Sequence, residues 1–333
     1  MNRQVEHERR ANGTPDQAAL DPDAQATAVN KHFASAANHW DRLYQEATLD
    51  GRIYQDRMAI ALQLIDQLHL PHTARLLEIG CGAGYATVAL ARRGYRIDAL
   101  DSVPTMIEIA CKRIAESGTA DKVRLGRADV RRLPMPDGSF DLVLALGVIP
   151  WLDDPAAAVR EMARVLRPGG YLLLSIDHDP HLEEVLDPRR NPVLKPLRRL
   201  VAAVLRAAGL LAPARSETHA ELFHRHSRRN FEAILSGAGL HKVRGLMVGF
   251  GPFTFFGRKL FSDSTGIKVH RALQAAAIRQ LPIVSSYGFQ YLVMATRPEE
   301  SPLVSSRDTS DPDKFPRRAP GSSTAEARYL STS

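Results

Sequence analysis

The segment Leu76–Gly84 constrains the fold of this chain more than any other stretch of the sequence. Its apolar run ends in Glu78, and glycines follow at positions 80, 82 and 84. Glycine has no Cβ, so the backbone can turn sharply here and let a ligand approach closely. The strand-like run before the turn and the helix-like run Tyr85–Arg93 predict a β-turn-α unit. Such a unit leaves free backbone N–H groups at a helix N-terminus, where an anionic group of a ligand can bind.

Two further acids follow at the ends of predicted strands. The strand 95–100 ends at Asp101, and the strand 123–130 carries Asp129. Ligands of open α/β sheets bind at the carboxyl ends of the strands, so a ligand-free turn is disfavoured. Asp101 could accept hydrogen bonds from two ribose hydroxyls. Asp129 could accept from an adenine amino group, with the Val130 N–H facing a ring nitrogen.

Predicted helices and strands alternate through the next hundred residues. Pro104–Ser117 reads as a helix with proline in its first turn. Residues 139–147 read as a buried parallel strand, because they are apolar and uninterrupted after a polar start. A helix over 155–166 is ended by Arg167–Gly170, and residues 171–176 form a fifth strand. This alternation predicts an α/β fold.

Residues 75–176 together resemble the core of class I S-adenosylmethionine (SAM)-dependent methyltransferases of type 11, a group that includes ubiquinone and menaquinone biosynthesis enzymes. The resemblance rests on the glycine turn, Asp101, Asp129 and the segments Leu133–Asp141 and Val165–Gly170. It implies a Rossmann-like, doubly wound sheet of seven strands in the order 3-2-1-4-5-7-6, with strand 7 antiparallel. It also implies SAM as the cofactor.

The resemblance places the methionine end of SAM at the glycine turn and runs the adenosine toward the two acids. The residues expected to bind the cofactor are Glu78, Gly80, Cys81, Gly82, Gly84, Asp101, Ser102, Met106, Asp129, Val130 and Leu146. Two positions depart from the family pattern. Val103 stands where the family often has Ser, and Ile149–Trp151 stands where it often has His. The second departure puts in doubt a family-wide catalytic role at that position.

Other functions for a glycine-rich turn remain to be weighed. A dinucleotide-dependent oxidoreductase needs the spacing G-x-G-x-x-G, whereas Gly80, Gly82 and Gly84 alternate. Asp129 and the Pro168–Gly170 turn have no role in such an enzyme, so an NAD(P) oxidoreductase is disfavoured. A non-catalytic SAM-binding scaffold stays open, because a cofactor site without an assignable base fits it as well.

Composition sets the expected domain organisation. Apolar residues make up 44% of the chain, which is ordinary for a globular protein. We expect disordered polar tails over 1–28 and 299–333, with one methyltransferase domain over 29–298 between them. Cys81 and Cys111 give no disulfide framework and suit a reducing cytoplasm. Oligomeric state is left open.

The residues between the first tail and the core predict helices beside the cofactor. Phe33, Ala37, Trp40 and Tyr44 fall at helical spacings, and a second helix is expected over 54–68. Trp40 or Tyr44 could form a lid over the cofactor or acceptor, and for Trp40 plain packing is weighted equally. Arg57 on the second helix could pair with the cofactor's carboxylate, although plain packing is the favoured interpretation there.

Two insertions, 177–226 and 251–286, distinguish the acceptor side. The first holds a helix over 195–211 with apolar positions 197, 200, 201, 204, 205 and 208 on one face. Arg198, Arg199 and Arg206 lie off that face, so this is a basic amphipathic helix. The second insertion begins within a stretch, residues 250–261, that has five phenylalanines in twelve positions.

Positive charge concentrates in the same region. Residues 178–260 hold 14 Lys and Arg against 7 Asp and Glu, an excess equal to the net charge of +7 of the whole chain. This favours an anionic partner, either an anionic membrane surface or an anionic acceptor. Nucleic acid is not expected, because no binding module is recognisable. An ordinary lid helix whose arginines are solvated is rated slightly above membrane contact, and peripheral association with the inner face of a membrane remains a hypothesis.

The mechanism follows from the resemblance. The methyl group of SAM is already activated, so the protein must align an acceptor O, N or C atom for in-line SN2 transfer and exclude water. We expect an apolar or lipid-like acceptor, such as a quinone, glycolipid or polyketide-type molecule, with a soluble anionic metabolite as the alternative. A base is needed only if the acceptor loses a proton. Candidates follow strand five, namely Asp177, His178, Asp179 and His181, with His178 first and His181 beside it. No metal is expected, since these residues are bunched in one loop.

Overall fold

The computed structural model describes residues 22–207 and 222–299. Seven strands form one sheet: β1 (Arg75–Ile79), β2 (Arg96–Asp101), β3 (Val123–Arg127), β4 (Phe140–Ala145), β5 (Leu166–Asp177), β6 (His241–Val248) and β9 (Gln290–Thr296). Their order is β3-β2-β1-β4-β5-β9-β6, and β9 runs antiparallel to both of its neighbours. The predicted strand order and the antiparallel seventh strand are confirmed.

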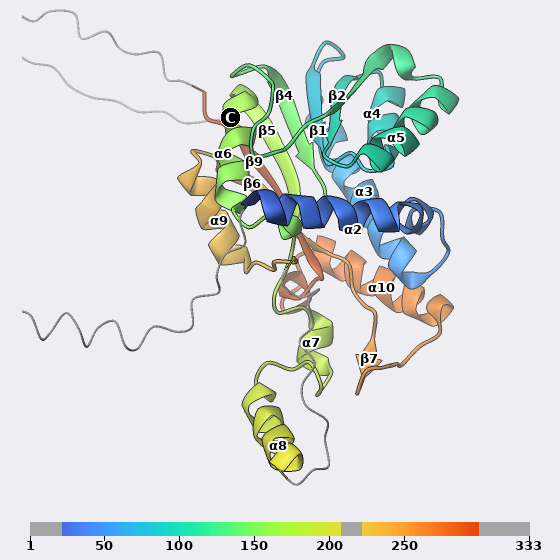
Figure 1. The fold of residues 1–333 in the computed structure, drawn as a ribbon, viewed down its shortest axis with the longest axis vertical. Helices are drawn as coiled ribbons and strands as arrows, with labels where there is room; N and C mark the ends of the chain where they lie inside the picture. The colour runs from blue at the N-terminus through green and yellow to red at the C-terminus, as the bar shows by residue number, and fades with distance from the viewer. Residues whose placement is uncertain (1–21, 208–221, 300–333) are drawn as a thin grey trace, which may run out of the picture. The chain divides into compact units, whose positions relative to one another are not determined.

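Helices cover both faces of this sheet (Figure 1). One face carries α3 (Leu49–Asp66), α4 (Tyr85–Arg92) and α5 (Pro104–Glu116), and the other carries α6 (Pro155–Val165) and α9 (Arg228–Gly237). The central strand shows why two layers form. Along β4, Val143 packs into the core cluster with α6, whereas its neighbours Leu142 and Leu144 pack into the cluster with α3 and α4. Successive side chains of a strand point to opposite faces, so an apolar run needs cover on both.

The parallel register brings the ends of the central strands to one level. Ile79 at the end of β1 pairs with Leu100 of β2, and Glu78 pairs with Leu144 of β4. The loops that leave these strands therefore start side by side. This edge is where ligands of doubly wound sheets bind.

Further helices and a second pair of strands complete the described elements besides short 3-10 turns. They are α2 (Pro22–Leu43), α7 (Leu182–Leu186), α8 (Lys195–Ala207), α10 (Asp263–Ile278) and a hairpin of β7 (Thr254–Phe255) and β8 (Arg258–Lys259). Among them, α10 packs against α3 and β6. In the described ranges, no helix combines the length and the apolar character that crossing a membrane requires.

Two expected boundaries are wrong. Residues 22–28, assigned to a disordered tail, form the first turns of α2. Their polar composition misled the prediction, because only one stripe of the helix is covered and Gln25 on that stripe is 4% exposed. Arg167–Gly170, expected to be a turn, begins β5, and the carbonyl of Gly170 accepts from the Arg297 N–H. The rest of both predicted tails lies outside the described residues, apart from Glu299.

Candidate functional site

A cavity of about 220 Å³ opens at the carboxyl ends of β1, β2 and β4. It is lined by ten of the residues expected to bind the cofactor: Glu78, Gly80, Cys81, Gly82, Asp101, Ser102, Met106, Asp129, Val130 and Leu146. The structure thus brings together residues that are up to 68 positions apart in the sequence. Gly84 does not line this cavity.

The conformation of the glycine turn explains why Gly82 lines the cavity and Gly84 does not. Gly82 has φ +53°, and a Cβ built on it meets no atom within 4 Å, so the backbone faces open space. Gly84, with φ +79°, caps α4, and a Cβ there would lie 3.3 Å from the Cα of Ala110 on α5. Gly82 therefore leaves room in which a ligand could approach the backbone, whereas Gly84 allows α4 and α5 to pack closely.

Asp101 links the turn to the next helix. Its Oδ2 accepts from the Gly82 N–H at 2.8 Å, and its Oδ1 accepts from the Val103 N–H at 2.9 Å. The residue is 8% exposed, and burial raises the pKa of its carboxyl group against these hydrogen bonds. A carboxylate oxygen can accept more than one hydrogen bond, so Asp101 keeps capacity for hydroxyl donors in the cavity.

Asp129 is held by its neighbour Arg131. The Nη2 of Arg131 donates to Oδ2 at 2.7 Å, and the Arg131 backbone N–H donates to Oδ1 at 2.8 Å. Burial alone would raise the pKa of Asp129, but these hydrogen bonds outweigh it and the pKa is lowered. Arg131 also contacts Asp23 of α2 at 3.3 Å. The predicted hydrogen bond from an adenine amino group to Asp129 would have to use acceptor sites on its carboxylate that Arg131 does not occupy.

Glu78 lies on the floor of the cavity. It is 4% exposed and accepts a hydrogen bond from the Thr87 hydroxyl at 2.6 Å. Burial raises the pKa of Glu78 to about 7, against the effect of that hydrogen bond. Its proton therefore comes off near neutral pH, well above the ordinary range of a glutamate.

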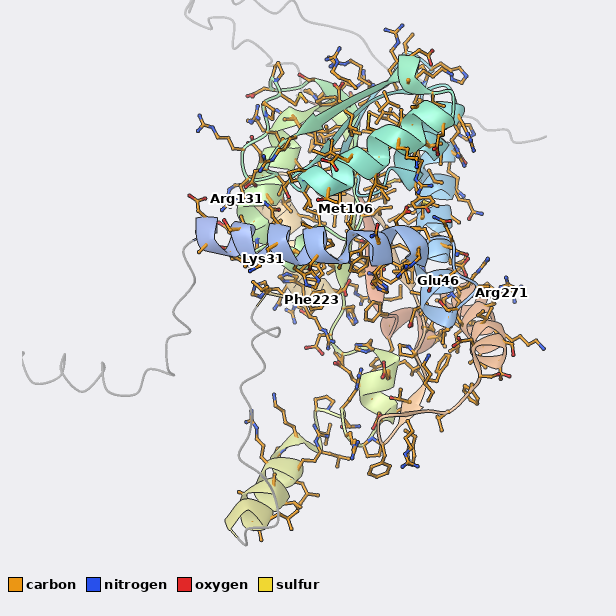
Figure 2. All side chains as sticks on the ribbon, turned by 45° about the vertical axis from the view of Figure 1, so that its right-hand side comes forward. Lys31, Glu46, Met106, Arg131, Phe223 and Arg271 are labelled. Atoms are coloured by element: carbon orange, nitrogen blue, oxygen red, sulfur yellow. The ribbon has the colours of Figure 1, made fainter. Side chains whose placement is uncertain are left out.

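Helix α2 crosses the cavity. Figure 2 shows it running between Met106 and Phe223, with Arg131 beside its N-terminal end. Aromatic rings line this region, because the Trp151 ring lies 4.8 Å from that of Phe33 and 5.1 Å from that of Phe223. These rings and α2 cover part of the cavity. The predicted lid position of Trp40 fits this arrangement, since Trp40 also lines the cavity.

Arg113 of α5 links α2 to the glycine turn. Its Nη2 donates to Asp41 Oδ1 at 2.5 Å, and its Nε donates to the carbonyl of Ala83 in the glycine turn at 2.7 Å. The guanidinium also lies 3.6 Å from the centre of the Tyr85 ring. One side chain therefore joins the covering helix to the turn beneath it.

The other end of the cavity holds a buried chain of polar groups. Arg57 is 3% exposed, and it donates from Nη2 to the Tyr44 hydroxyl at 2.7 Å and from Nη1 to Gln290 Oε1 at 3.4 Å. Gln290 in turn donates to Asp177 Oδ1 at 2.8 Å. The Arg57 Nε has no hydrogen-bond partner among the described residues. A buried guanidinium with a spare donor can bind an anionic oxygen.

The sequence pointed to only some of the four residues in this chain, which are Tyr44, Arg57, Gln290 and Asp177. Asp177 was a candidate base, and Arg57 was weighed and set aside in favour of plain packing. Gln290 was missed. It opens β9, and only the antiparallel register in which Asp177 pairs with Gln290 brings the two together. No local pattern around Gln290 indicates this.

His178 and His181 lie beside the cavity but do not line it. They are 6% and 2% exposed. The His181 ring lies against the Phe289 ring at 5.4 Å and within 3.4 Å of a Glu184 carboxylate oxygen. Burial lowers the pKa of His178, which favours its neutral form. The structure brings Asp177, but not the two histidines, to the cavity, so a catalytic role for them stays a prediction.

Comparison with known proteins identifies the core. Residues 77–174 match the family model described as a methyltransferase domain. This chain carries a methyltransferase domain. The predicted resemblance is thereby confirmed for the core.

Curated relatives agree with this family. Over 113 residues the chain is 38% identical to the malonyl-[acyl-carrier protein] O-methyltransferase of Serratia marcescens, covering 34% of this chain and 42% of that protein. Over 165 residues it is 30% identical to the ubiquinone biosynthesis O-methyltransferase of Xanthomonas campestris, covering 47% and 66%. Over 168 residues it is 29% identical to the demethylmenaquinone methyltransferase of Lactiplantibacillus plantarum, covering 50% and 65%. The matches thus span less than two thirds of each relative.

A solved structure shares the fold of the methyltransferase domain. The magnesium protoporphyrin IX methyltransferase of Synechocystis superposes with a TM-score of 0.54 at 17% identity, over 82% of this chain and 99% of that one. The family match itself, residues 77–174, includes the glycine turn, Asp101 and Asp129 but excludes Arg57, Asp177 and Gln290. The end of the cavity that holds these three residues therefore lies outside the part of the chain that matches the family.

Proposed function

We propose that this protein uses SAM to methylate an O, N or C atom of an apolar or lipid-like small molecule by in-line SN2 transfer. One observation carries the proposal. A single cavity is lined at one end by the glycine turn and Asp101, and at the other by the buried chain that joins Arg57, Gln290 and Asp177. A donor site and an acceptor site would therefore meet in one cavity.

The donor end fits SAM. The methyl group that SAM supplies is activated by its sulfonium. The open space at Gly82, just before the N-terminal end of α4, suits the approach of an anionic ligand end. Asp101 would orient the ribose, while α2 and its aromatic neighbours exclude water. Catalysis would then rest chiefly on alignment of the acceptor with the S–CH₃ bond.

Two features bear on the acceptor. Trp40, Tyr54, Trp151 and Phe223 line the cavity and favour an apolar molecule, as do relatives named for ubiquinone and menaquinone biosynthesis. The buried Arg57 with its spare donor favours an anionic oxygen, and so supports the second candidate, an anionic metabolite. An amphiphile with an oxygen at its reacting end would meet both requirements.

Mass spectrometry of cells that lack the gene tests this function. The acceptor should accumulate as a species lighter than its product by one CH₂ unit, and adding it to the purified protein with SAM should yield S-adenosylhomocysteine. Calorimetry with SAM tests the donor end separately. A protein that does not bind SAM, or that binds it while no such species accumulates, would contradict the proposal.

We also propose that the protein associates with anionic membranes through a basic-aromatic surface, defined as α8 together with the β7–β8 hairpin. The exposed apolar side chains of this surface are Leu197, Leu200, Val201, Val204, Phe255 and Phe256. Its described basic side chains include Arg198, Arg199, Arg258 and Lys259. Apolar side chains beside cations suit the boundary of an anionic bilayer.

Hydrogen bonds of Asp187 join the hairpin to the segment that leads into α8. Asp187 follows α7, in the insertion that carries α8, and its Oδ2 accepts from the Thr254 hydroxyl at 2.7 Å and the Gly257 N–H at 3.0 Å. Its Oδ1 accepts from the Phe256 N–H at 3.1 Å. None of the apolar side chains that the structure describes on α8 lines the cavity, which weighs against the alternative of a lid helix buried in the acceptor site.

A further inference from the structure

A second cavity, of about 240 Å³, lies beside the first. Its wall is largely apolar and includes Trp40, Leu43, Ile53, Tyr54, Pro252 and Phe289. His39 and Asp50 complete part of the lining, and both are exposed, so the cavity opens to solvent on their side. A hollow with apolar walls and one open end suits an apolar chain.

One aromatic pair stands between the two cavities. Trp40 and Tyr54 line both of them, and their rings lie edge to face at 5.8 Å. The Trp40 indole N–H is buried and finds no acceptor in the part of the chain that the structure describes. Buried donors ordinarily have a partner, and an oxygen of a ligand lying between the cavities would supply one.

The polar end of such a ligand has a place on the other side of this pair. The Arg57 guanidinium lies 4.8 Å from the centre of the Tyr54 ring and lines the first cavity only. Leu43 and Ile53, by contrast, line the second cavity only. The path from Arg57 past Tyr54 to Leu43 therefore changes from charged to apolar.

We propose that the second cavity binds the distal apolar chain of an amphiphilic acceptor whose polar head lies beside Arg57. This rests on the proposed function for the identity of the ligand as an acceptor. It makes the acceptor elongated, with its reacting oxygen at one end and an alkyl or prenyl chain at the other. It also makes chain length a determinant of affinity.

Two gallate esters test this, because propyl gallate and dodecyl gallate share one head and differ only in chain length. Calorimetry in the presence of S-adenosylhomocysteine should give dodecyl gallate an affinity at least about tenfold higher, since each buried methylene contributes. Leu43→Phe and Ile53→Phe fill the second cavity and should reduce that ratio toward one. Ala34→Phe adds the same ring at an exposed position of α2 that lines neither cavity, and should leave the ratio unchanged.

A fluorescence measurement covers the case in which the filled variants fail to fold. The sequence has two tryptophans, Trp40 and Trp151, so Trp151→Phe leaves Trp40 as the reporter. Dodecyl gallate should change its emission at concentrations where propyl gallate does not. Equal responses to both esters, no response to either, or a chain-length preference that persists in the filled variants would overturn the inference. If the protein did not bind SAM, the proposed function would be overturned instead. The ratio of the affinities for dodecyl gallate and propyl gallate would still test whether the second cavity binds an apolar chain.

Discussion

Asp101 has two partners in the protein, and a ligand would add more. Replacing it by Asn keeps its shape but removes the charge, so hydrogen bonds to ribose hydroxyls and to the Gly82 N–H weaken together. Charge-assisted hydrogen bonds contribute roughly 1.5–3 kcal/mol each. We therefore expect Asp101→Asn to weaken SAM binding in calorimetry by about ten- to a hundredfold.

Asp98 provides the matched control on the same strand. It forms an ion pair with Arg75 at 3.2 Å and does not line the cavity. Asp98→Asn should bind SAM as the unaltered protein does. Equal affinity of Asp101→Asn and Asp98→Asn would remove Asp101 from the cofactor site.

Glu78 makes stability depend on pH in a predictable direction. Its pKa in the folded protein is about 7, against 4.5 for the ordinary side chain. The folded state therefore holds this proton more tightly than the unfolded chain. The stability it contributes is fully present below the unfolded pKa and is lost as pH rises through the folded one. The contribution of Glu78 to the free energy of unfolding should therefore fall by roughly 3 kcal/mol between about pH 4 and about pH 8.

Glu78→Gln has no proton to lose, so the part of the pH dependence that comes from Glu78 should disappear. Thermal unfolding of the ligand-free protein across this pH range measures it. The unaltered protein should lose stability relative to Glu78→Gln as pH rises toward 8, by roughly the amount above. Parallel curves for the two proteins would mean that Glu78 keeps an ordinary pKa.

The base, if one is used, can be assigned by comparing neighbours. Burial raises the pKa of Asp177, whereas Gln290 and Arg57 lower it, and the net direction is upward. Asp177 lines the cavity and His178 does not. If the acceptor loses a proton to Asp177, Asp177→Asn should slow turnover by about a hundredfold or more without changing SAM affinity. The turnover of His178→Ala should fall by far less. If His178→Ala were slowed more than Asp177→Asn, the base would be His178, as the sequence predicted.

At the scale of elements, α2 is the part whose position decides access to the cofactor. Its ion pair with Arg113 is half-buried and is joined to the glycine turn through Ala83. Arg113→Gln breaks both connections, so the dissociation rate of SAM in stopped-flow measurements should rise by about tenfold. Lys112→Gln alters the neighbouring exposed cation on α5 and should leave the rate unchanged. No difference between the two variants would show that α2 is held by its apolar stripe alone.

The basic-aromatic surface predicts binding to anionic vesicles. The double variant Arg198→Gln, Arg199→Gln should reduce flotation with phosphatidylserine-containing liposomes, because each surface cation contributes about 1 kcal/mol near such a bilayer. Arg228→Gln, Arg229→Gln makes the same charge change on the exposed side of α9 and serves as control. Absence of flotation by the unaltered protein, or equal loss in both double variants, would exclude this surface as the membrane contact.

For the whole molecule, the strand order could be predicted because residues 75–176 resemble a known family, and the order that this resemblance implies is the one observed. The cofactor end followed from that order. Asp101 and Asp129 each stand at or just after a strand end, and all carboxyl ends of the parallel strands share one edge. The predicted start of the ordered domain was wrong because residues 22–28 are polar in composition and yet are partly buried in α2. In the first turns of α2, one covered stripe was enough to order a polar segment.

The sequence by itself predicted the methyltransferase fold and most residues at the Gly80–Gly84 end of the cavity, because the turn is a local pattern and the two acids follow parallel strands that share one edge. The tertiary structure decided the other end of the cavity. Arg57, Asp177 and Gln290 come from α3, β5 and β9, and they meet only because β9 runs antiparallel to β5 in one register. The pairing that joins residues 113 positions apart depends on the packing of the whole sheet, for which no local pattern is a substitute.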